Sequence, residues 1–264
     1  MITAGIDIGS SSAKIVIMKN NEIIGHAVIP TQPDSVATSK AILEEGLSKS
    51  NLTRRNLKYI VATGYGRVNV PYSDEYITEI SCHSRGAHWF FPSVRTILDM
   101  GGQDCKAIRC NDRGQVTNYM MNDKCAAGTG RFLEIISDTL EIPLEEIGPL
   151  SLKASGTIPI SSVCAVFARQ EIISSLKRGE SKENILLSLF ESIATRVMGL
   201  VYKVGIESDF MVTGGIAKNI GILNRIQNKI KDVNTLACEN PQIVGALGAA
   251  VFAHEHIDRL FSGN

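Results

Sequence analysis

The sequence predicts a two-lobed α/β fold, built from a duplicated β-sheet unit with a cleft between the lobes. The segments IDIGSSSAKIVIM and LDMGGQDCKAIRC share the pattern D-x-G-x4-K, and aligning Asp7 with Asp99 brings their glycines and lysines into register. A second matched pair follows, because LKYIVATGYG and SDFMVTGGIAKN both end an apolar run at Thr-Gly. Two matched sets in the same order favour duplication over chance similarity of one short motif.

Each half is expected to begin as a β-meander. Its β-branched runs are broken by turn signals, KNNE in the first half and NDRGQ in the second. A helix-like stretch and a further strand then close each half. These last strands end at Thr63-Gly64 and at Thr213-Gly214.

The boundary between the lobes is expected near Phe91-Pro92, because proline favours a break in regular structure. Residues 1–92 are therefore assigned to an N-terminal lobe, which a C-terminal helix over 241–260 completes. Residues 93–240 are assigned to a C-terminal lobe. The length of 264 residues suits two domains of ordinary size.

The composition narrows the classes of partner. Twenty-seven basic and 27 acidic residues cancel, so no global field indicates nucleic acid or an anionic membrane as a partner. The N-terminus MITAGIDIGSS lacks a charged leader, and no stretch has the unbroken apolar length of a membrane span. A cytoplasmic location is expected, where the six cysteines would be reduced. Those that have a function, expected to be only some of the six, would then be metal ligands or catalytic groups rather than disulfide partners.

Tight glycine turns after apolar strands predict a nucleotide site. Such turns present backbone N–H groups to an anion, and glycine lets a phosphate approach the chain closely. The Gly214-Gly215 pair ends a strand and precedes a helix, which suits the ribose or base. The predicted nucleotide-binding residues are Gly9, Ser10, Ser11, Ser12, Gly101, Gly102, Gln103, Gly214 and Gly215.

Carboxylates beside these turns are the candidate catalytic groups. Asp7 and Asp99 directly precede the turns, where Mg²⁺ bound to phosphate needs oxygen ligands, in part through water. Gln103 and Asp104 lie where a side chain could orient or deprotonate an attacking water. Asp104 could equally be a solvated carboxylate at a strand end. The lysines of the repeat lie further down their strands and suit phosphate contact less well than the turns do.

Taken together, these motifs resemble the phosphate-1, phosphate-2 and adenosine motifs of the actin, sugar-kinase and acetate-kinase superfamily. The resemblance covers nearly the whole chain and implies a duplicated actin-like, ribonuclease H-like ATPase fold. It also implies ATP or ADP bound in the cleft, with closure of the lobes coupled to the γ-phosphate.

Two cysteine motifs stand outside that superfamily pattern. Cys125 and Cys164 each precede an expected helix, from about Thr129 and about Ala165, and helix N-termini stabilise anions such as thiolates. A [4Fe-4S] cluster normally takes four thiolates, and the chain has no C-x-x-C motif. A twofold axis through such a cluster would supply the missing pair. On spacing alone, two buried free cysteines remain the simpler interpretation.

The segments NDKCAAGTGRFLE and ISSVCAVFA closely resemble the ATP-dependent activators of 2-hydroxyacyl-CoA dehydratases and the ATPase subunits of benzoyl-CoA reductases. Members of that family are homodimers with one bridging [4Fe-4S] cluster. The resemblance implies that Cys125 and Cys164 are the ligands of such a cluster. It also implies ATP-driven transfer of one electron to a dehydratase or reductase partner, with ferredoxin or flavodoxin as the donor.

The family pattern is not followed everywhere. Arg169-Gln170-Glu171 stands where many dehydratase activators carry an acidic residue and a serine before the glutamate, so the partner enzyme is left open. Cys105 and Cys110 are expected to be core or surface thiols, and Cys82 a packing residue. His83 and His88 do not share a helix face and are poor metal candidates.

Two other functions are compatible with the fold. A small-molecule kinase would need a sugar- or acid-binding segment, which the sequence does not supply. A nucleotide-switched scaffold would polymerise with concentration and hold no cluster. Neither alternative accounts for the paired cysteine motifs.

Overall fold

The computed structural model describes residues 1–122, 126–160 and 165–262. In this part of the chain two mixed sheets have the strand orders β3-β2-β1-β4-β5 and β10-β9-β6-β7-β8. The first contains β1 (Ile2–Ile8), β2 (Ser12–Lys19), β3 (Glu22–Pro30), β4 (Tyr59–Thr63) and β5 (Glu75–Tyr76). The second contains β6 (Thr96–Met100), β7 (Cys105–Cys110), β8 (Val116–Asn122), β9 (Phe210–Thr213) and β10 (Thr235–Leu236).

Helices surround both sheets. They are α1 (Ser35–Lys49), α2 (Glu79–Phe90), α3 (Gly130–Leu140), α4 (Ile147–Ser151), α5 (Ala165–Lys177), α6 (Lys182–Val204), α7 (Ile220–Lys229) and α8 (Val244–Ser262). Short 3-10 turns are η1 (Arg54–Asn56), η2 (Arg67–Asn69), η3 (Gly215–Lys218) and η4 (Pro241–Ile243). Polar caps fix several starts: the Asp34 carboxylate, for example, accepts hydrogen bonds from the first amides of α1.

The register of the strands shows the duplication directly. In the first sheet, Asp7 lies opposite Lys14 on the antiparallel neighbour β2 and opposite Thr63 on the parallel neighbour β4. In the second sheet, Asp99 lies opposite Lys106 on β7 and Thr213 on β9 in the same way. The predicted meanders and closing strands are therefore confirmed, and the two-lobed α/β architecture with them.

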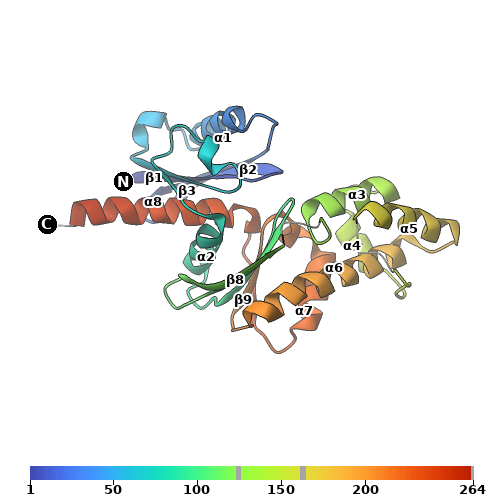
Figure 1. Cartoon of the computed structure of the whole chain (residues 1–264). Coiled ribbons are helices and arrows are strands. Elements are labelled where there is room, and N and C mark those ends of the chain that lie inside the picture. The colour runs from blue at the N-terminus through green and yellow to red at the C-terminus, as the bar shows by residue number, and fades with distance from the viewer. Residues whose placement is uncertain (123–125, 161–164, 263–264) are drawn as a thin grey trace.

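Two helices connect the sheets. The long helix α8 lies along the first sheet, in contact with β1, β2 and β4, and α2 packs beside α8 (Figure 1). α2 also contacts β6, β7, β8 and β9 of the second sheet. Helices α3 to α7 lie on the side of the second sheet away from α8, and the N-terminus lies beside the free end of α8 (Figure 1). The division of the chain at residue 92 stays a prediction.

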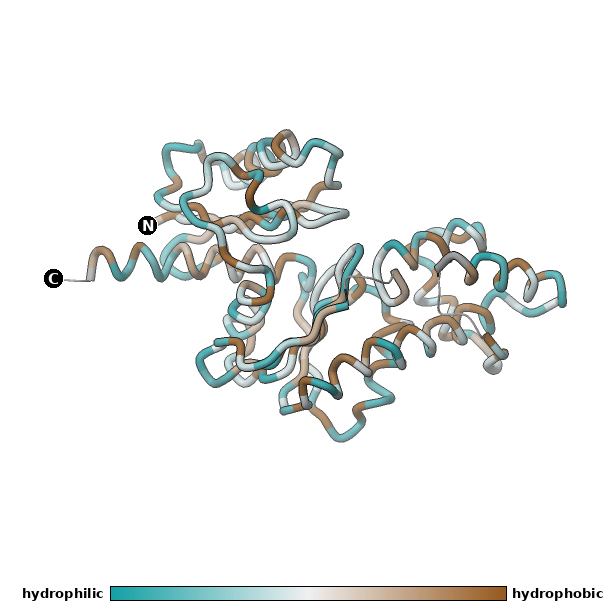
Figure 2. The backbone as a smooth tube through the Cα atoms, in the orientation of Figure 1, coloured by the Kyte–Doolittle hydropathy of each residue, from teal (hydrophilic) through white to brown (hydrophobic). Residues whose placement is uncertain are grey.

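Each lobe has an apolar core. The first is built from β1, β2, β4 and α1 and includes Ile6, Ile15 and Ile42; the second includes Phe190 and Phe210. Hydropathy alternates along α8 (Figure 2), as expected for a helix with one buried face. Among the described residues one helix, α6, has the length and composition to cross a membrane, but 56% of its apolar window is buried within the fold.

Candidate nucleotide-binding site

A cleft of about 800 Å³ is lined by strand ends and turns from both sheets. It contains every predicted nucleotide-binding and catalytic residue: Asp7, Gly9, Ser10, Ser11, Ser12, Asp99, Gly101, Gly102, Gln103, Asp104, Gly214 and Gly215. The duplication explains this convergence. Each Asp ends a strand at the same edge of its sheet, so the two turns that follow face one another across the cleft.

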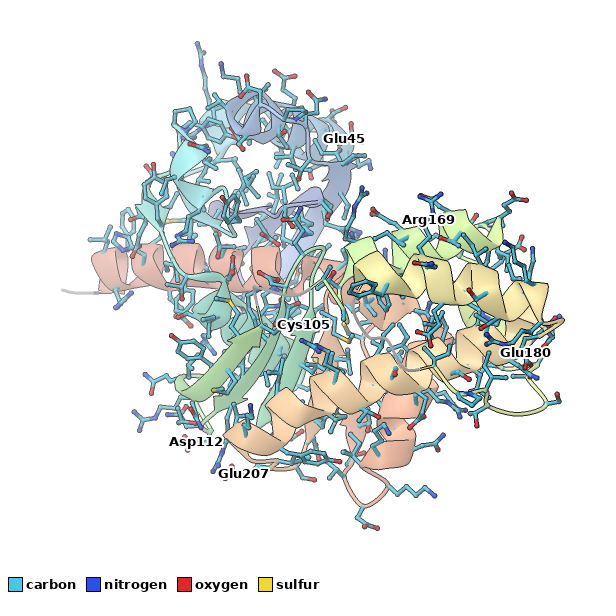
Figure 3. All side chains as sticks on the ribbon, turned by 45° about the vertical axis from the view of Figure 1, so that its right-hand side comes forward. Glu45, Cys105, Asp112, Arg169, Glu180 and Glu207 are labelled. Atoms are coloured by element: carbon cyan, nitrogen blue, oxygen red, sulfur yellow. The ribbon has the colours of Figure 1, made fainter. Side chains whose placement is uncertain are left out.

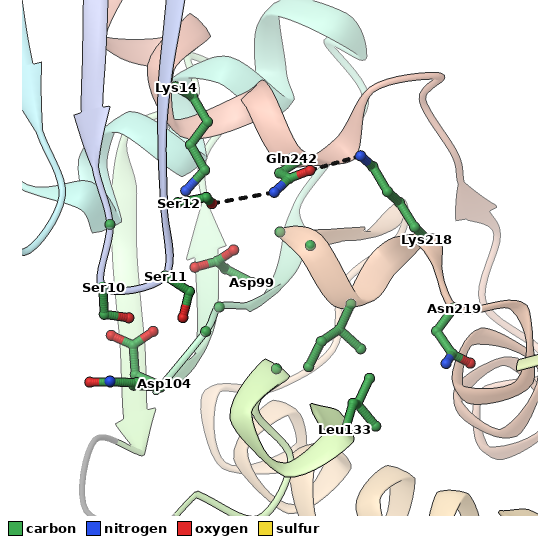
Figure 4. A pocket seen from close by; sticks show the side chains of 18 of the residues that line it. Ser10, Ser11, Ser12, Lys14, Asp99, Asp104, Leu133, Lys218, Asn219 and Gln242 are labelled. Carbon is green, nitrogen blue, oxygen red and sulfur yellow. Dashed lines mark hydrogen bonds between the residues drawn. The ribbon is translucent and has the colours of Figure 1, made fainter. Parts of the chain in front are cut away.

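The two turns come within van der Waals distance. A Cβ atom placed on Gly102 would lie 2.1 Å from the hydroxyl oxygen of Ser11. Figure 4 shows Asp99 pointing into the space between the Ser10–Ser12 turn and Gln242. Backbone amides of both turns can thus surround one chain of phosphates, which is the arrangement that glycine turns favour.

A glycine with positive φ follows the closing strand of each half. Gly64 has φ +86°, and a Cβ there would lie 2.3 Å from Asp7 Oδ1. Gly214 has φ +85°, and a Cβ there would lie 2.8 Å from Asp99 Oδ1. Both positions need glycine for conformation and for space, which explains why Thr-Gly recurs in the repeat.

The carboxylates of the two copies are held differently. Asp7 Oδ2 accepts a hydrogen bond from Lys14 Nζ at 3.1 Å. In the second copy, Lys106 Nζ lies 3.4 Å from Asp99 Oδ2, 2.7 Å from Asp104 Oδ1 and 3.3 Å from Glu79 Oε1. The repeat lysines therefore serve as internal counterions. Asp104, expected either to act on water or to be solvated, is paired with Lys106 at the edge of the cleft.

This cluster perturbs the ionisation of its members. Burial raises the pKa of Asp99, but His83 and Lys106 lower it more, so the pKa lies below its ordinary value. Burial lowers the pKa of Lys106, but the neighbouring carboxylates raise it above the ordinary lysine value. Asp99 is therefore held as a carboxylate, the form that can bind Mg²⁺ directly or through water.

Three hydrogen-bonded side chains connect η3 and η4 to the first turn of the cleft. Lys218 Nζ donates to Gln242 Oε1 at 2.7 Å, and Gln242 Nε2 donates to Ser12 Oγ at 3.3 Å (Figure 4). Apolar side chains, among them Leu133, Leu144 and Ile216, also line the cleft, beside polar ones such as Glu134 and Glu145. The cleft thus offers both glycine turns and apolar side chains, as a nucleoside phosphate requires.

Sequence reasoning missed several polar residues that line the cleft, among them Glu79, His83, Lys218 and Gln242. They come from α2, η3 and η4, and only tertiary packing brings them to the strand ends. Lys218 was the easiest to find, since it follows the Gly214-Gly215 pair in the GGIAK segment. Across the described ranges no three or more His, Cys, Asp or Glu side chains form a metal-ion site.

The second turn is joined to the start of α3. Gly130 N donates to Gly101 O, and Arg131 N donates to Gly102 O, both at 2.9 Å. The Cys105 thiol donates to Gly128 O at 2.7 Å, and Figure 3 shows Cys105 inside the molecule. Cys125 and Cys164 lie outside the described residues. Helices do begin near the expected positions, α3 at Gly130 and α5 at Ala165, and the two helices contact one another.

A duplicated two-lobed fold with glycine turns and strand-end carboxylates around one cleft defines a nucleotide-binding protein of the actin-like ATPase class. Residues 4–253 match the model of the BadF/BadG/BcrA/BcrD ATPase family. The chain belongs to this family.

Individual relatives agree over nearly the whole chain. The activator of lactoyl-CoA dehydratase from Anaerotignum propionicum is 45% identical over 97% of this chain and 98% of its own length. The (R)-2-hydroxyglutaryl-CoA dehydratase activating ATPase from Acidaminococcus fermentans is 38% identical over 96% and 97%. The solved activator of 2-hydroxyisocaproyl-CoA dehydratase from Clostridium difficile, with bound ADPNP, superposes with a TM-score of 0.94 at 38% identity, covering 100% of this chain and 98% of that one.

Proposed function

We propose that this protein is an ATP-hydrolysing one-electron reductase that activates a partner enzyme of the 2-hydroxyacyl-CoA dehydratase or benzoyl-CoA reductase type. The observation that carries the proposal is the hydrogen-bonded contact between the nucleotide cleft and the segment after Cys125. Two backbone hydrogen bonds tie the Gly101-Gly102 turn to Gly130 and Arg131. A change in the turn when a γ-phosphate binds or leaves would therefore move the start of α3.

The nucleotide would occupy the cleft with its phosphates between the two turns and its base toward Leu133 and Ile216. Gly214 and Gly215 would contact the ribose or base. Asp7 and Asp99 offer hard oxygen ligands, which suit Mg²⁺. When bound, Mg²⁺ would neutralise phosphate charge. Gln103 is exposed at the mouth of the cleft and, with Asp104, is the candidate for orienting the attacking water.

Cys125 and Cys164 would hold one [4Fe-4S] cluster together with the same two residues of a second protomer. The adjacent described structure suits that role, since helices begin directly after Cys164 and five residues after Cys125, and free N–H groups at helix N-termini stabilise an anionic group. The cluster would supply a single electron of low potential. A ferredoxin or flavodoxin in the cytoplasm would be the electron donor.

The partner is expected to dock near the surface of α5. Arg169, where the chain departs from many dehydratase activators, is exposed on this helix (Figure 3). That difference bears on which partner the protein serves rather than on ATP hydrolysis, because Arg169 is not among the residues that line the cleft.

Iron and acid-labile sulfide, measured on anaerobically purified protein alongside its native mass, test the proposal. About four of each per dimer are expected, the composition of one [4Fe-4S] cluster. Cys125→Ser should lose the cluster and keep nucleotide binding. Cys238→Ser is the matched control, because Cys238 is a half-buried free thiol away from the cleft. A full cluster in Cys125→Ser would overturn the ligand assignment.

Iron-free anaerobic protein that binds ATP would instead favour the kinase or scaffold alternatives. ATP turnover that rises with a small-molecule acceptor would indicate a kinase. Polymerisation that depends on protein concentration and nucleotide would indicate a scaffold.

A further inference from the structure

His83 lies on α2 with 6% of its surface exposed, at the border of the cleft. Its Nδ1 is 3.0 Å from Thr213 Oγ1 and 3.5 Å from Asp99 Oδ1. The Thr213 hydroxyl donates to Asp99 Oδ1 at 3.2 Å. A hydroxyl has one proton, so Thr213 Oγ1 is left to accept a hydrogen bond from His83 Nδ1–H. The three side chains thus form a directed chain from His83 through Thr213 to Asp99.

The other edge of the imidazole faces the first half of the molecule. A Cβ atom placed on Gly245, at the start of α8, would lie 2.8 Å from His83 Nε2 and 3.2 Å from Asp7 Oδ2. The ring therefore fills the space between the carboxylates of the two copies.

The first copy has no equivalent of this chain. The Thr63 hydroxyl, which corresponds to that of Thr213, is fully buried, and a thiol rather than an imidazole lies beside it. Its neighbour from α2 is the Cys82 thiol, whose pKa burial raises, so that the group is a neutral and weak donor. Consecutive residues of α2 thus face the two copies, and only Asp99 is connected to an imidazole.

α2 restrains the second oxygen of Asp99 as well. Glu79, one helical turn before His83 and on the same face, pairs with Lys106, whose Nζ is 3.4 Å from Asp99 Oδ2. One oxygen of Asp99 is therefore fixed through His83 and Thr213, and the other through Lys106.

We propose that His83 is a positioning residue, which holds the Asp99 carboxylate in the orientation that binds the Mg²⁺–nucleotide complex. The proposal rests on the ATPase function proposed above. In this role His83 acts on Asp99 through Thr213 rather than on the nucleotide or the metal itself. Partners of this kind typically change metal affinity or activity by about 10- to 100-fold when they are lost.

Two amide substitutions separate the hydrogen bond from the bulk of the ring. His83→Asn places an N–H close to the position of Nδ1, whereas His83→Gln places its amide near Nε2 and leaves Thr213 without a donor. His26→Asn, on an exposed position of β3, is the matched control. The measurements are the steady-state rate of ATP hydrolysis as a function of Mg²⁺ concentration and the affinity for ADP without Mg²⁺.

For His83→Gln we expect kcat to fall, or the Mg²⁺ concentration for half-maximal rate to rise, by about 10- to 100-fold. ADP affinity without Mg²⁺ should change less than about twofold, because the proposed role of His83 concerns the carboxylate that binds Mg²⁺. His83→Asn should stay within about threefold of the wild type in each measurement, as rescue of the same hydrogen bond requires.

Equal losses in His83→Asn and His83→Gln would overturn the proposal, because the ring would then matter only as packing. Wild-type rates in His83→Gln would overturn it too. A wild-type protein that hydrolyses no ATP would refute the proposed function, and the role of His83 with it.

Discussion

Gly214→Ala should destabilise the protein for two independent reasons. Gly214 has φ +85° and ψ 179°, a region that residues with side chains occupy only at a cost of about 1–3 kcal/mol. The new Cβ would also lie 2.3 Å from the carbonyl oxygen of Met100 and 2.8 Å from Asp99 Oδ1. Forcing a methyl group into a packed site costs about 1–3 kcal/mol more.

The expected loss in the free energy of unfolding is therefore about 2–6 kcal/mol. At about 2–4 °C per kcal/mol for a chain near this size, Tm should fall by roughly 4–24 °C. The assay is urea and thermal unfolding followed by far-UV circular dichroism. Because the carboxylate of Asp99 must shift to make room, Gly214→Ala should also weaken Mg²⁺-dependent nucleotide binding.

The neighbouring residue supplies the control. A Cβ on Gly215 would meet no atom closer than Gln242 Nε2 at 3.8 Å, an ordinary contact. Gly215→Ala should therefore change the free energy of unfolding by less than about 0.5 kcal/mol. Equal unfolding midpoints for the two variants would refute the reasoning from φ and space.

Three further outcomes are expected. Lys106→Met should lower the free energy of unfolding by about 3–5 kcal/mol, because a buried ion pair loses one partner. The native pKa of Asp99 lies below its unfolded value, so the stabilising effect of the Asp99 carboxylate is lost as the pH falls. Without Lys106 the native pKa of Asp99 rises. Acid unfolding of Lys106→Met should therefore begin at a higher pH in a circular dichroism titration. Burial raises the pKa of Tyr72 from 10.0 to about 12. The unfolded chain therefore loses this proton first, and the free energy of unfolding should fall as the pH rises between these values. Tyr72→Phe should remove that pH dependence in urea titrations. Gly102→Ala should weaken MgADP binding in calorimetry while the protein stays folded, because the new Cβ would clash with the Ser11 hydroxyl of the first turn. Unchanged MgADP affinity would show that binding does not require the two turns to lie this close together.

Local chemistry made much of the site predictable from the sequence. Asp7, Asp99 and their glycine turns follow apolar strands in a repeated pattern, and a strand followed by a glycine turn has the same geometry wherever the strand lies in a sheet. The repeat further implied that both turns meet one cleft. A few adjacent residues carry this information, so it can be recognised without knowing how the chain packs.

Residues that reach the site through tertiary packing were not predictable in that way. His83 and Glu79 approach Asp99 only because α2 lies against α8 and the second sheet together. The role of Lys106 as a counterion depends on cross-strand register, which fixes the position of its ammonium group opposite Asp99. No sequence motif around the histidine indicates its function.

Hydrogen–deuterium exchange of residues 126–134 tests the central claim that the cleft and the segment after Cys125 are coupled. The amides of Gly130 and Arg131 donate to Gly101 and Gly102, so their exchange reports on this contact itself. The account predicts that MgADP and a magnesium complex of a non-hydrolysable ATP analogue give different exchange rates at these two amides. Identical rates in the two complexes, with both nucleotides bound, would contradict it.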